Sequence, residues 1–289
     1  MLHPARRIKQ KLYIQKYLVS LPVPYPVGDM FNRATGDPAE TIEPTVIADT
    51  NGVKVTANSF SRGFVPMMNL TVENSGDKEV ELSFYPLIVN GFQTSADFIS
   101  QSGEDESYQP SVLLAPHSSS DYDLHFNTTL AEEEYMAFYT QICFNVRLID
   151  PVTYQVIATQ KSVINTSAYG HYDYEYDESG DVVYNDNGIK FIYKGLSDDG
   201  LVQPIFYISN QSDKDIVIRV KETGINGTEG EGVFGVDVFS GCRITASPGI
   251  LTDTAPGDSV RMIFEICERT EDVGNEQVLY TTDPFTFTL

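Results

Sequence analysis

The sequence contains no tryptophan, and its 289 residues include only three cysteines, Cys143, Cys242 and Cys267. Three cysteines cannot form a disulfide framework or, alone, a four-ligand zinc site, and no two of them are spaced as Cys-x-x-Cys. We interpret them as three semi-buried thiols and leave open one bridge, between Cys242 and Cys267. The absence of tryptophan excludes the Cys–Trp–Cys core of an antibody-type domain.

Positive charge is also scarce. Lys and Arg number 19 against 41 Asp and Glu, which gives a net charge of −22. We expect no nucleic-acid partner, because cations must replace the counterions of a phosphate backbone. No apolar run reaches the roughly 18 residues of a membrane helix, so we expect no integral membrane span in this chain. Hydrophobic residues still make up 41% of the sequence, enough to fill the cores of about two domains.

The few cations are concentrated at the start of the chain. Residues 1–20 contain Arg and Lys side chains but no acid, and apolar residues follow between Leu12 and Leu21. This pattern is only partly that of a signal peptide, because Lys16 interrupts the apolar run, prolines follow at once and no Ala-x-Ala cleavage site is present. We predict instead a short amphipathic helix that caps the first domain, or a disordered arm.

From about residue 45, apolar and polar residues alternate. The pattern is clearest in 68–73, 80–85 and 142–149. Side chains of a strand point alternately to opposite faces, so this period predicts antiparallel sheets with one buried and one solvated face. Asn-Gly, Ser-Gly-Asp and Ala-Pro clusters between these runs predict turns. No strand–helix–strand rhythm is present, which disfavours a dinucleotide-binding fold.

An internal repeat divides the chain into two copies. Three segments return at one constant offset: Asn51-Gly-Val-Lys-Val as Asn187-Gly-Ile-Lys-Phe, Asn74-Ser-Gly-Asp-Lys-Glu-Val as Asn210-Gln-Ser-Asp-Lys-Asp-Ile, and Val89-Asn-Gly as Ile225-Asn-Gly. Further along the register changes, and we align Leu114-Ala-Pro with Thr254-Ala-Pro. The second copy is shorter, which we attribute to the loss of one hairpin or of a short insertion at Leu130–Tyr135.

The repeated residues are those that favour turns, because Asn, Asp and Gly tolerate a positive φ and tight hairpins. With about eight short strands per copy, the sequence predicts an all-β protein of two tandem immunoglobulin-like antiparallel β-sandwiches. The predicted boundaries are a basic, Pro-rich segment at 1–44, a first sandwich at 45–167, an acidic Tyr-rich linker at 168–182 and a second sandwich at 183–289.

These motifs, a strand followed by Asn-Ser-x-Asp-Lys-x-Val, then Val-Asn-Gly and an Ala-Pro turn, resemble a group of uncharacterised immunoglobulin-like modules. Such modules occur, sometimes in tandem, in surface and secreted proteins of Gram-positive, often gut-dwelling, bacteria. The resemblance covers roughly residues 46–165 and 183–289. It implies a sandwich fold and an extracellular or cell-surface location, and it supplies no catalytic residues.

The segment from His117 to His125 comes nearest to a catalytic cluster. On a strand, Asp121, Asp123 and His125 would share one face. A catalytic triad would also need a nucleophile turn, and no Gly-x-Ser-x-Gly is present. In our alignment the second copy carries Ala255-Pro-Gly-Asp-Ser-Val in place of this cluster. We interpret the segment as a polar loop and the wet face of a strand, assign no catalytic residue, and expect no enzymatic activity.

Tyrosines alternate with acids over Tyr172–Asp177 in the linker. A period of two predicts an extended segment that packs its tyrosines on a neighbouring surface and turns its acids to solvent. Oxygen-rich segments can bind calcium, although Glu178 stands where an EF-hand needs glycine. We expect no cofactor or metal other than weakly bound calcium, for which the candidate ligands are Asp173, Glu175, Asp177 and Asp181.

Three functions fit these features. The first is a non-enzymatic cell-surface or secreted binding or adhesion protein, whose partner is an unknown protein or a glycan. The second is a structural spacer for another domain or the cell wall, and the third is a hydrolase with an unrecognised site. A large exposed apolar patch would favour binding. Uniformly charged faces would favour the spacer, and a deep pocket with convergent carboxylates would favour the hydrolase.

Overall fold

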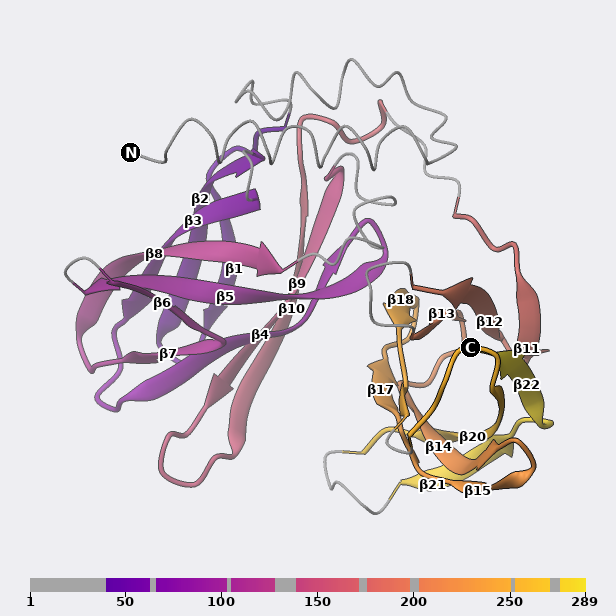
Figure 1. Cartoon of the computed structure of the whole chain (residues 1–289). Helices are drawn as coiled ribbons and strands as arrows, with labels where there is room; N and C mark the ends of the chain where they lie inside the picture. The colour runs from indigo at the N-terminus through magenta and orange to yellow at the C-terminus, as the bar shows by residue number, and fades with distance from the viewer. Residues whose placement is uncertain are drawn as a thin grey trace.

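The computed structural model describes residues 40–62, 66–102, 105–127, 139–171, 176–197, 203–250, 253–270 and 276–289. These residues form 22 strands and no helix. They are arranged as two β-sandwiches in succession along the chain (Figure 1). No helix among the described residues is long and apolar enough to cross a membrane. The basic segment at 1–39 lies outside the described residues, so the structure does not test the prediction made for it.

Two antiparallel sheets form the first sandwich. One has the order β1-β2-β3-β8-β5, with β6 beside β5; its strands are β1 (Thr45–Thr50), β2 (Val53–Arg62), β3 (Pro66–Asn74), β8 (Ser118–Asn127), β5 (Phe92–Ser102) and β6 (Asp105–Gln109). The other has the order β10-β9-β4-β7; its strands are β10 (Val156–Asn165), β9 (Gln141–Ile149), β4 (Val80–Val89) and β7 (Ser111–Leu114). The end of β4 also pairs with the start of β5, so the two sheets are joined at that corner.

The second sandwich repeats this pairing. One sheet has the order β11-β12-β13-β18, with strands β11 (Asp181–Asp186), β12 (Ile189–Leu196), β13 (Pro204–Asn210) and β18 (Cys242–Ala246). The other is built on β14 (Ile216–Ile225), which pairs β15 (Thr228–Gly230), β17 (Gly235–Val238) and β20 (Ser259–Glu268), and β20 pairs β21 (Gln277–Thr281) and β22 (Phe285–Thr288). A two-stranded sheet joins β16 (Gly232–Val233) to β19 (Gly249–Ile250). The fold prediction is therefore confirmed.

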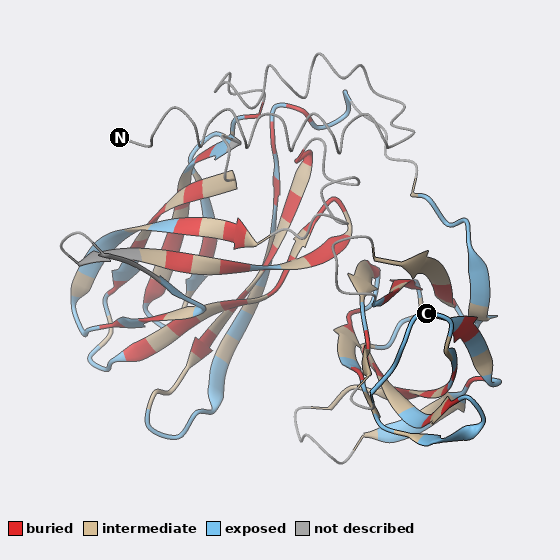
Figure 2. Ribbon diagram, viewed as in Figure 1, coloured by how far each residue is buried: buried red, intermediate tan, exposed pale blue. Residues whose placement is uncertain are grey.

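The alternating runs become strands with one buried face (Figure 2). In β9 every second side chain is buried, from Ile142 to Leu148, and β4 follows the same pattern from Val80 to Phe84. Burial of each large apolar side chain contributes roughly 1.5–3 kcal/mol. Aromatic rings fill both cores, with Phe84 against Phe98 and Phe144 in the first and with Phe191, Phe206, Phe234 and Phe264 in the second.

Equivalent asparagines terminate β3 and β13, as the repeat predicts. The Nδ2 group of Asn74 donates hydrogen bonds to the carbonyl oxygens of Lys78, Leu114 and Ala115, at 2.9–3.1 Å. Asn210 Nδ2 donates to Lys214 and Val238 carbonyls, both at 2.8 Å. The Oδ1 atom of each asparagine accepts a bond from the backbone N–H two residues later. One buried amide thus closes the hairpin and ties it to the following edge strand.

The alignment of Leu114-Ala-Pro with Thr254-Ala-Pro is wrong. Leu114 pairs with Val80, whereas the residue that pairs with Ile216, the counterpart of Val80, is Val238. Thr254-Ala-Pro instead precedes β20. The shortening occurs in two places, between the Val-Asn-Gly turn and this edge strand, where the β5–β6 hairpin has no full counterpart, and between β18 and β20. Loops can change length without affecting a core. The short Ala-Pro motif lies in such loops, so it does not show which strands of the two copies are equivalent.

Candidate functional site

The acidic and histidine cluster on β8 is distributed along the solvated face of its sheet. Asp121 and Asp123 project from the same face and accept hydrogen bonds from Thr71 Oγ1, at 2.6 Å, and Asn69 Nδ2, at 3.1 Å. His125 lies edge-on to the Tyr108 ring. His117 lies at the turn before β8, where its Nε2 is 3.0 Å from Asp77 Oδ1. Neighbouring strands and turns thus bond to Asp121, Asp123 and His117, as expected for the solvated face of a strand, whereas the buried Nδ1 atom of His125 has no hydrogen-bond partner among the described residues.

The counterpart of this cluster in the second copy was misidentified. Asn74 pairs with Ser118 at the start of β8, and Asn210 pairs with Cys242 at the start of β18. The segment equivalent to β8 is therefore Cys242–Ala246. Ala255-Pro-Gly-Asp-Ser-Val lies at the turn before β20 and at its beginning.

The calcium candidates are only partly within the described residues. Asp173 and Glu175 lie outside them. Asp177 Oδ2 accepts a hydrogen bond from Lys194 Nζ at 2.7 Å, and burial, which alone would raise the pKa of Asp177, is outweighed by hydrogen bonds from Lys194 and Ser179 that lower it to about 2. Asp181 is exposed at the start of β11. No three His, Cys, Asp or Glu side chains of the described residues converge as a metal site. Calcium binding by this segment stays a prediction.

All three cysteines are free thiols. The bridge left open between Cys242 and Cys267 is not formed. Burial raises the pKa of Cys143 and Cys267, and it raises that of Cys242 to about 12, because a thiolate is poorly solvated there. Thiols held protonated in this way are weak nucleophiles. They therefore behave as the semi-buried thiols that the sequence predicted.

The two sandwiches meet at an interdomain junction centred on Asp237 of β17. Asp237 Oδ2 accepts hydrogen bonds from Tyr85 of β4, at 2.9 Å, and from Arg269 Nε, at 2.8 Å. The Arg269 guanidinium also lies 5.1 Å from the centre of the Phe239 ring. Burial, followed by the hydrogen bond and negative charge of Asp237, raises the pKa of Tyr85 to about 12. One carboxylate therefore joins an aromatic side chain of the first sandwich to a cation of the second.

A buried glutamine adds backbone-directed bonds at the same junction. Gln93 Nε2 donates to the Asp237 carbonyl at 2.8 Å, and Gln93 Oε1 accepts from the Phe239 N–H at 3.2 Å. Beside it, β5 and β18 make one parallel bridge, between Phe92 and Arg243. These bonds satisfy main-chain groups that the contact of the two sandwiches removes from water, and they fix the register of that contact.

The linker contributes an aromatic side chain to this junction. The Tyr176 hydroxyl donates to the Asn90 carbonyl at 2.8 Å, and its ring packs on Phe92. The Arg243 guanidinium stacks 3.7 Å from the centre of the same ring. The prediction that linker tyrosines pack on a neighbouring surface is confirmed for Tyr176, whereas Tyr172 and Tyr174 lie outside the described residues.

Strand β13 is buried on both faces because of this contact. Phe206 and Ile208 enter the core of the second sandwich, while Tyr207 belongs to the core of the first and is 0% exposed. The Tyr207 hydroxyl donates to Glu178 of the linker at 3.3 Å. Burial raises the pKa of Tyr207 to about 12, with the nearby charges of Arg243 and Glu178 acting in opposite directions.

Stability should consequently fall in strong alkali. Below pH 10 the tyrosine is protonated in both states, but between pH 10 and 12 the unfolded chain ionises Tyr207 while the folded chain keeps it neutral. The stabilisation from this group is lost as the pH rises through that window, by up to about 2.7 kcal/mol. Urea unfolding at pH 9 and pH 11 should show a smaller pH effect in Tyr207→Phe than in the wild type. Tyr154→Phe, at an exposed tyrosine, is the matched control, and an equal effect in both variants would contradict this origin.

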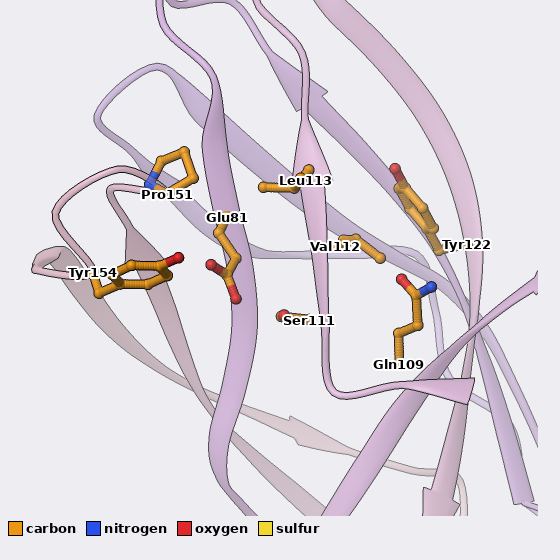
Figure 3. A pocket seen from close by; sticks show the side chains of 8 residues that line it. All are labelled: Glu81, Gln109, Ser111, Val112, Leu113, Tyr122, Pro151 and Tyr154. Carbon is orange, nitrogen blue, oxygen red and sulfur yellow. The ribbon is translucent and has the colours of Figure 1, made fainter. Parts of the chain in front are cut away.

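A second feature is an apolar hollow beside β7, of about 560 Å³. Figure 3 shows Glu81, Pro151 and Tyr154 on one side of β7 and Gln109 and Tyr122 on the other. Large apolar side chains are exposed here, with Leu113 57% and Tyr154 78% exposed, and Val152 in the adjoining turn is 84% exposed. We call Leu113, Val152 and Tyr154, with the hollow, the β7 surface. Exposed apolar groups that gather around a hollow are typical of an interaction site.

A larger hollow, of about 780 Å³, lies on the second sandwich along β14 and the β14–β15 turn. Its lining includes Lys221, Glu222 and Arg261 beside four glycines, and it has no aromatic ring. Arg261 lies 3.7 Å from Glu222, so part of this charge is internally paired. The aromatic platform expected of a sugar site is therefore lacking in this hollow.

No protein-family model matches the chain, and no curated protein matches it. Among solved structures, the YadV chaperone is 9% identical with a TM-score of 0.22, over 76% of this chain and 92% of that one. A chaperone–tip adhesion subunit complex from the Csu pili of Acinetobacter baumannii is 8% identical with a TM-score of 0.18, over 76% and 90%. Red sea bream transglutaminase is 8% identical with a TM-score of 0.20, over 78% and 28%. Likenesses this distant assign no function.

Of the junction, the sequence predicted only the packing of linker tyrosines, and it did not predict the β7 surface. Tyr85 and Asp237 belong to different copies, and no local spacing links them. The β7 surface did leave a signal in Ser111-Val-Leu-Leu. Since Val112 and Leu114 point inward by alternation, Leu113 between them must point outward, where an apolar residue requires an explanation.

Proposed function

We propose that this chain is a non-enzymatic binding protein that acts at the cell surface or outside the cell, and that its binding site is the β7 surface. The observation that carries the proposal is the exposure of Leu113 and Tyr154 around one hollow, with Val152 exposed in the adjoining turn. Each exposed apolar group lowers solubility without stabilising the fold, and their clustering is best explained by a partner that covers them. The location follows from the resemblance to surface and secreted modules.

The junction supports a rigid arrangement of the two sandwiches in this role. A binding surface held on a fixed frame loses less conformational entropy when its partner docks. A pure spacer would need no exposed apolar cluster. A hydrolase would need a nucleophile and base in mutual contact, whereas Asp121, Asp123 and His117 of the β8 cluster contact neighbouring strands and turns instead.

A display selection tests the proposal. A random peptide library and a glycan array are each presented to the wild type, to Leu113→Ser/Tyr154→Ser, and to Val182→Ser, a control at a 58% exposed valine of the second sandwich. We expect ligands that bind the wild type and the control but bind the double variant at least tenfold more weakly. Ligands that bind the double variant equally well would place the site elsewhere.

The non-enzymatic part has its own test. We expect no turnover of ester, peptide or glycoside substrates by the purified protein. Hydrolysis that His125→Ala abolishes would overturn this part, since it would assign chemistry to the β8 cluster. Hydrolysis that persists in His125→Ala and is absent from a mock purification without the protein would equally contradict this part of the proposal.

A further inference from the structure

We propose that the β7 surface accepts an extended peptide segment of a separate protein, which adds as a strand to the edge of β7 and carries alternating apolar and basic side chains. This inference rests on the proposed function, because it names the partner of the same site. Three observations carry it, namely the pairing of β7, the chemistry of its two faces, and the charge around it.

Strand β7 is an edge of its sheet. Among the described residues it pairs with β4 alone, through Ser83↔Ser111 to Val80↔Leu114. In an antiparallel ladder, alternate residues direct their N–H and C=O groups to the two sides, so β7 directs half of these groups away from β4. Asn74 Nδ2 already donates to the Leu114 carbonyl, so an added strand would bond to the groups of Ser111–Leu113. The hollow lies beside this edge (Figure 3). An extended peptide can satisfy such groups by main-chain bonds, as in strand addition.

The two faces of β7 select the side chains of the added strand. Val112 faces the core and Tyr122 lines the hollow on that side, whereas Leu113 faces outward with Pro151 and Tyr154 close by. Alternate residues of an added strand would point to these two sides. Inward residues would meet Val112 and Tyr122, so apolar side chains fit there. Outward residues would lie beside Leu113, which suits side chains with an apolar stem.

Charge determines what those outward side chains carry. Glu81 lies directly opposite Leu113 on the outer face, and it is the one charged residue among those that line the hollow. The whole chain carries a net charge of −22. Lysine and arginine combine an apolar stem with a positive end, so they can cover Leu113 and reach toward Glu81. An acidic strand would be repelled by the same charges.

Fluorescence anisotropy with a defined probe tests this inference. The probe is an eight-residue labelled peptide that alternates valine with lysine or threonine. We expect saturable binding, weakened about tenfold or more when proline replaces a central valine, because proline cannot donate to the ladder. Replacing the lysines by glutamates should abolish binding, and Glu81→Lys should weaken binding of the original probe and strengthen that of the glutamate version. Leu113→Ser should weaken binding of the original probe about tenfold, and Val182→Ser should leave this binding unchanged.

Amide hydrogen exchange supplies the readout specific to strand addition. The bound probe should protect amides within Ser111–Leu113, with no equal gain on the second sandwich. If display-selected ligands need Leu113 but tolerate proline at every position, strand addition is overturned while the binding function stands. If neither the binding of the probe nor that of any selected ligand depends on Leu113, both strand addition and the proposed binding site are contradicted. Self-association of the full chain that Leu113→Ser abolishes would overturn the assignment to a separate partner.

Discussion

Asn210→Ala should destabilise the protein by about 2–4 kcal/mol, and Asn74→Ala should have a comparable effect. Each asparagine is buried, and its amide donates to carbonyls of the hairpin and of the following edge strand. Alanine would leave those carbonyl oxygens without their donor. A buried polar group deprived of its partner costs roughly 1–3 kcal/mol. Each variant has one such group, the carbonyl of Leu114 or of Val238, and the other lost amide bonds add to this cost.

Urea denaturation followed by circular dichroism measures this effect, with Asn185→Ala as the control. Asn185 is an exposed asparagine of β11, so its replacement should change the free energy of unfolding by no more than about 0.5 kcal/mol. Equal decreases in the free energy of unfolding in the control and in Asn210→Ala would show that the turn motif does not stabilise the fold. Because the motif is repeated, a decrease for Asn210→Ala without one for Asn74→Ala, or the reverse, would also contradict this explanation.

The asparagine turns show why so much of the fold could be predicted from the sequence. Much of their information is local: Asn74 contacts Lys78 in its own hairpin as well as the more distant Leu114 and Ala115. Alternation such as that of 142–149 requires only strand geometry. The two copies supply the same information twice. The register beyond Asn226 could not be predicted, because it depends on which edge strand follows β14, and loop lengths there differ between the copies.

The contacts between the two sandwiches could not be predicted from the sequence, and the two Asn-Gly turns show the physical reason. Asn90-Gly91 and Asn226-Gly227 have nearly identical positive φ values, so the sequence predicts equivalent turns. Among the described residues, this turn contacts the other sandwich and the linker in the first copy alone. The Gly91 carbonyl accepts from the Arg243 N–H, and a Cβ added to Gly91 would lie 3.2 Å from the Tyr176 hydroxyl. A duplicated motif thus acquires a second role through contacts between distant segments.

Asp237→Ala should release the two sandwiches from each other. The substitution removes the carboxylate that both Tyr85 and Arg269 contact. Truncating one partner of a buried charged pair typically costs about 3–5 kcal/mol, and we expect about 2–3 kcal/mol here because the Arg269 side chain is 19% exposed. Thermal unfolding of the wild type should be a single transition, since the junction couples the sandwiches, whereas the variant should show two.

Hydrogen exchange distinguishes loss of the junction from general unfolding. In Asp237→Ala the amides of Phe239 and Arg243, which donate across the junction to Gln93 and Gly91, should exchange faster, while amides within β9 and β20 keep their protection. Asp215→Ala is the matched control, because Asp215 accepts the Ser240 N–H within the second sandwich. If Asp237→Ala accelerates exchange equally throughout both sandwiches, the carboxylate stabilises the fold as a whole and the junction is not a separable contact. If neither exchange nor unfolding changes, Gln93 and the Tyr176–Arg243 stack hold the sandwiches together without it.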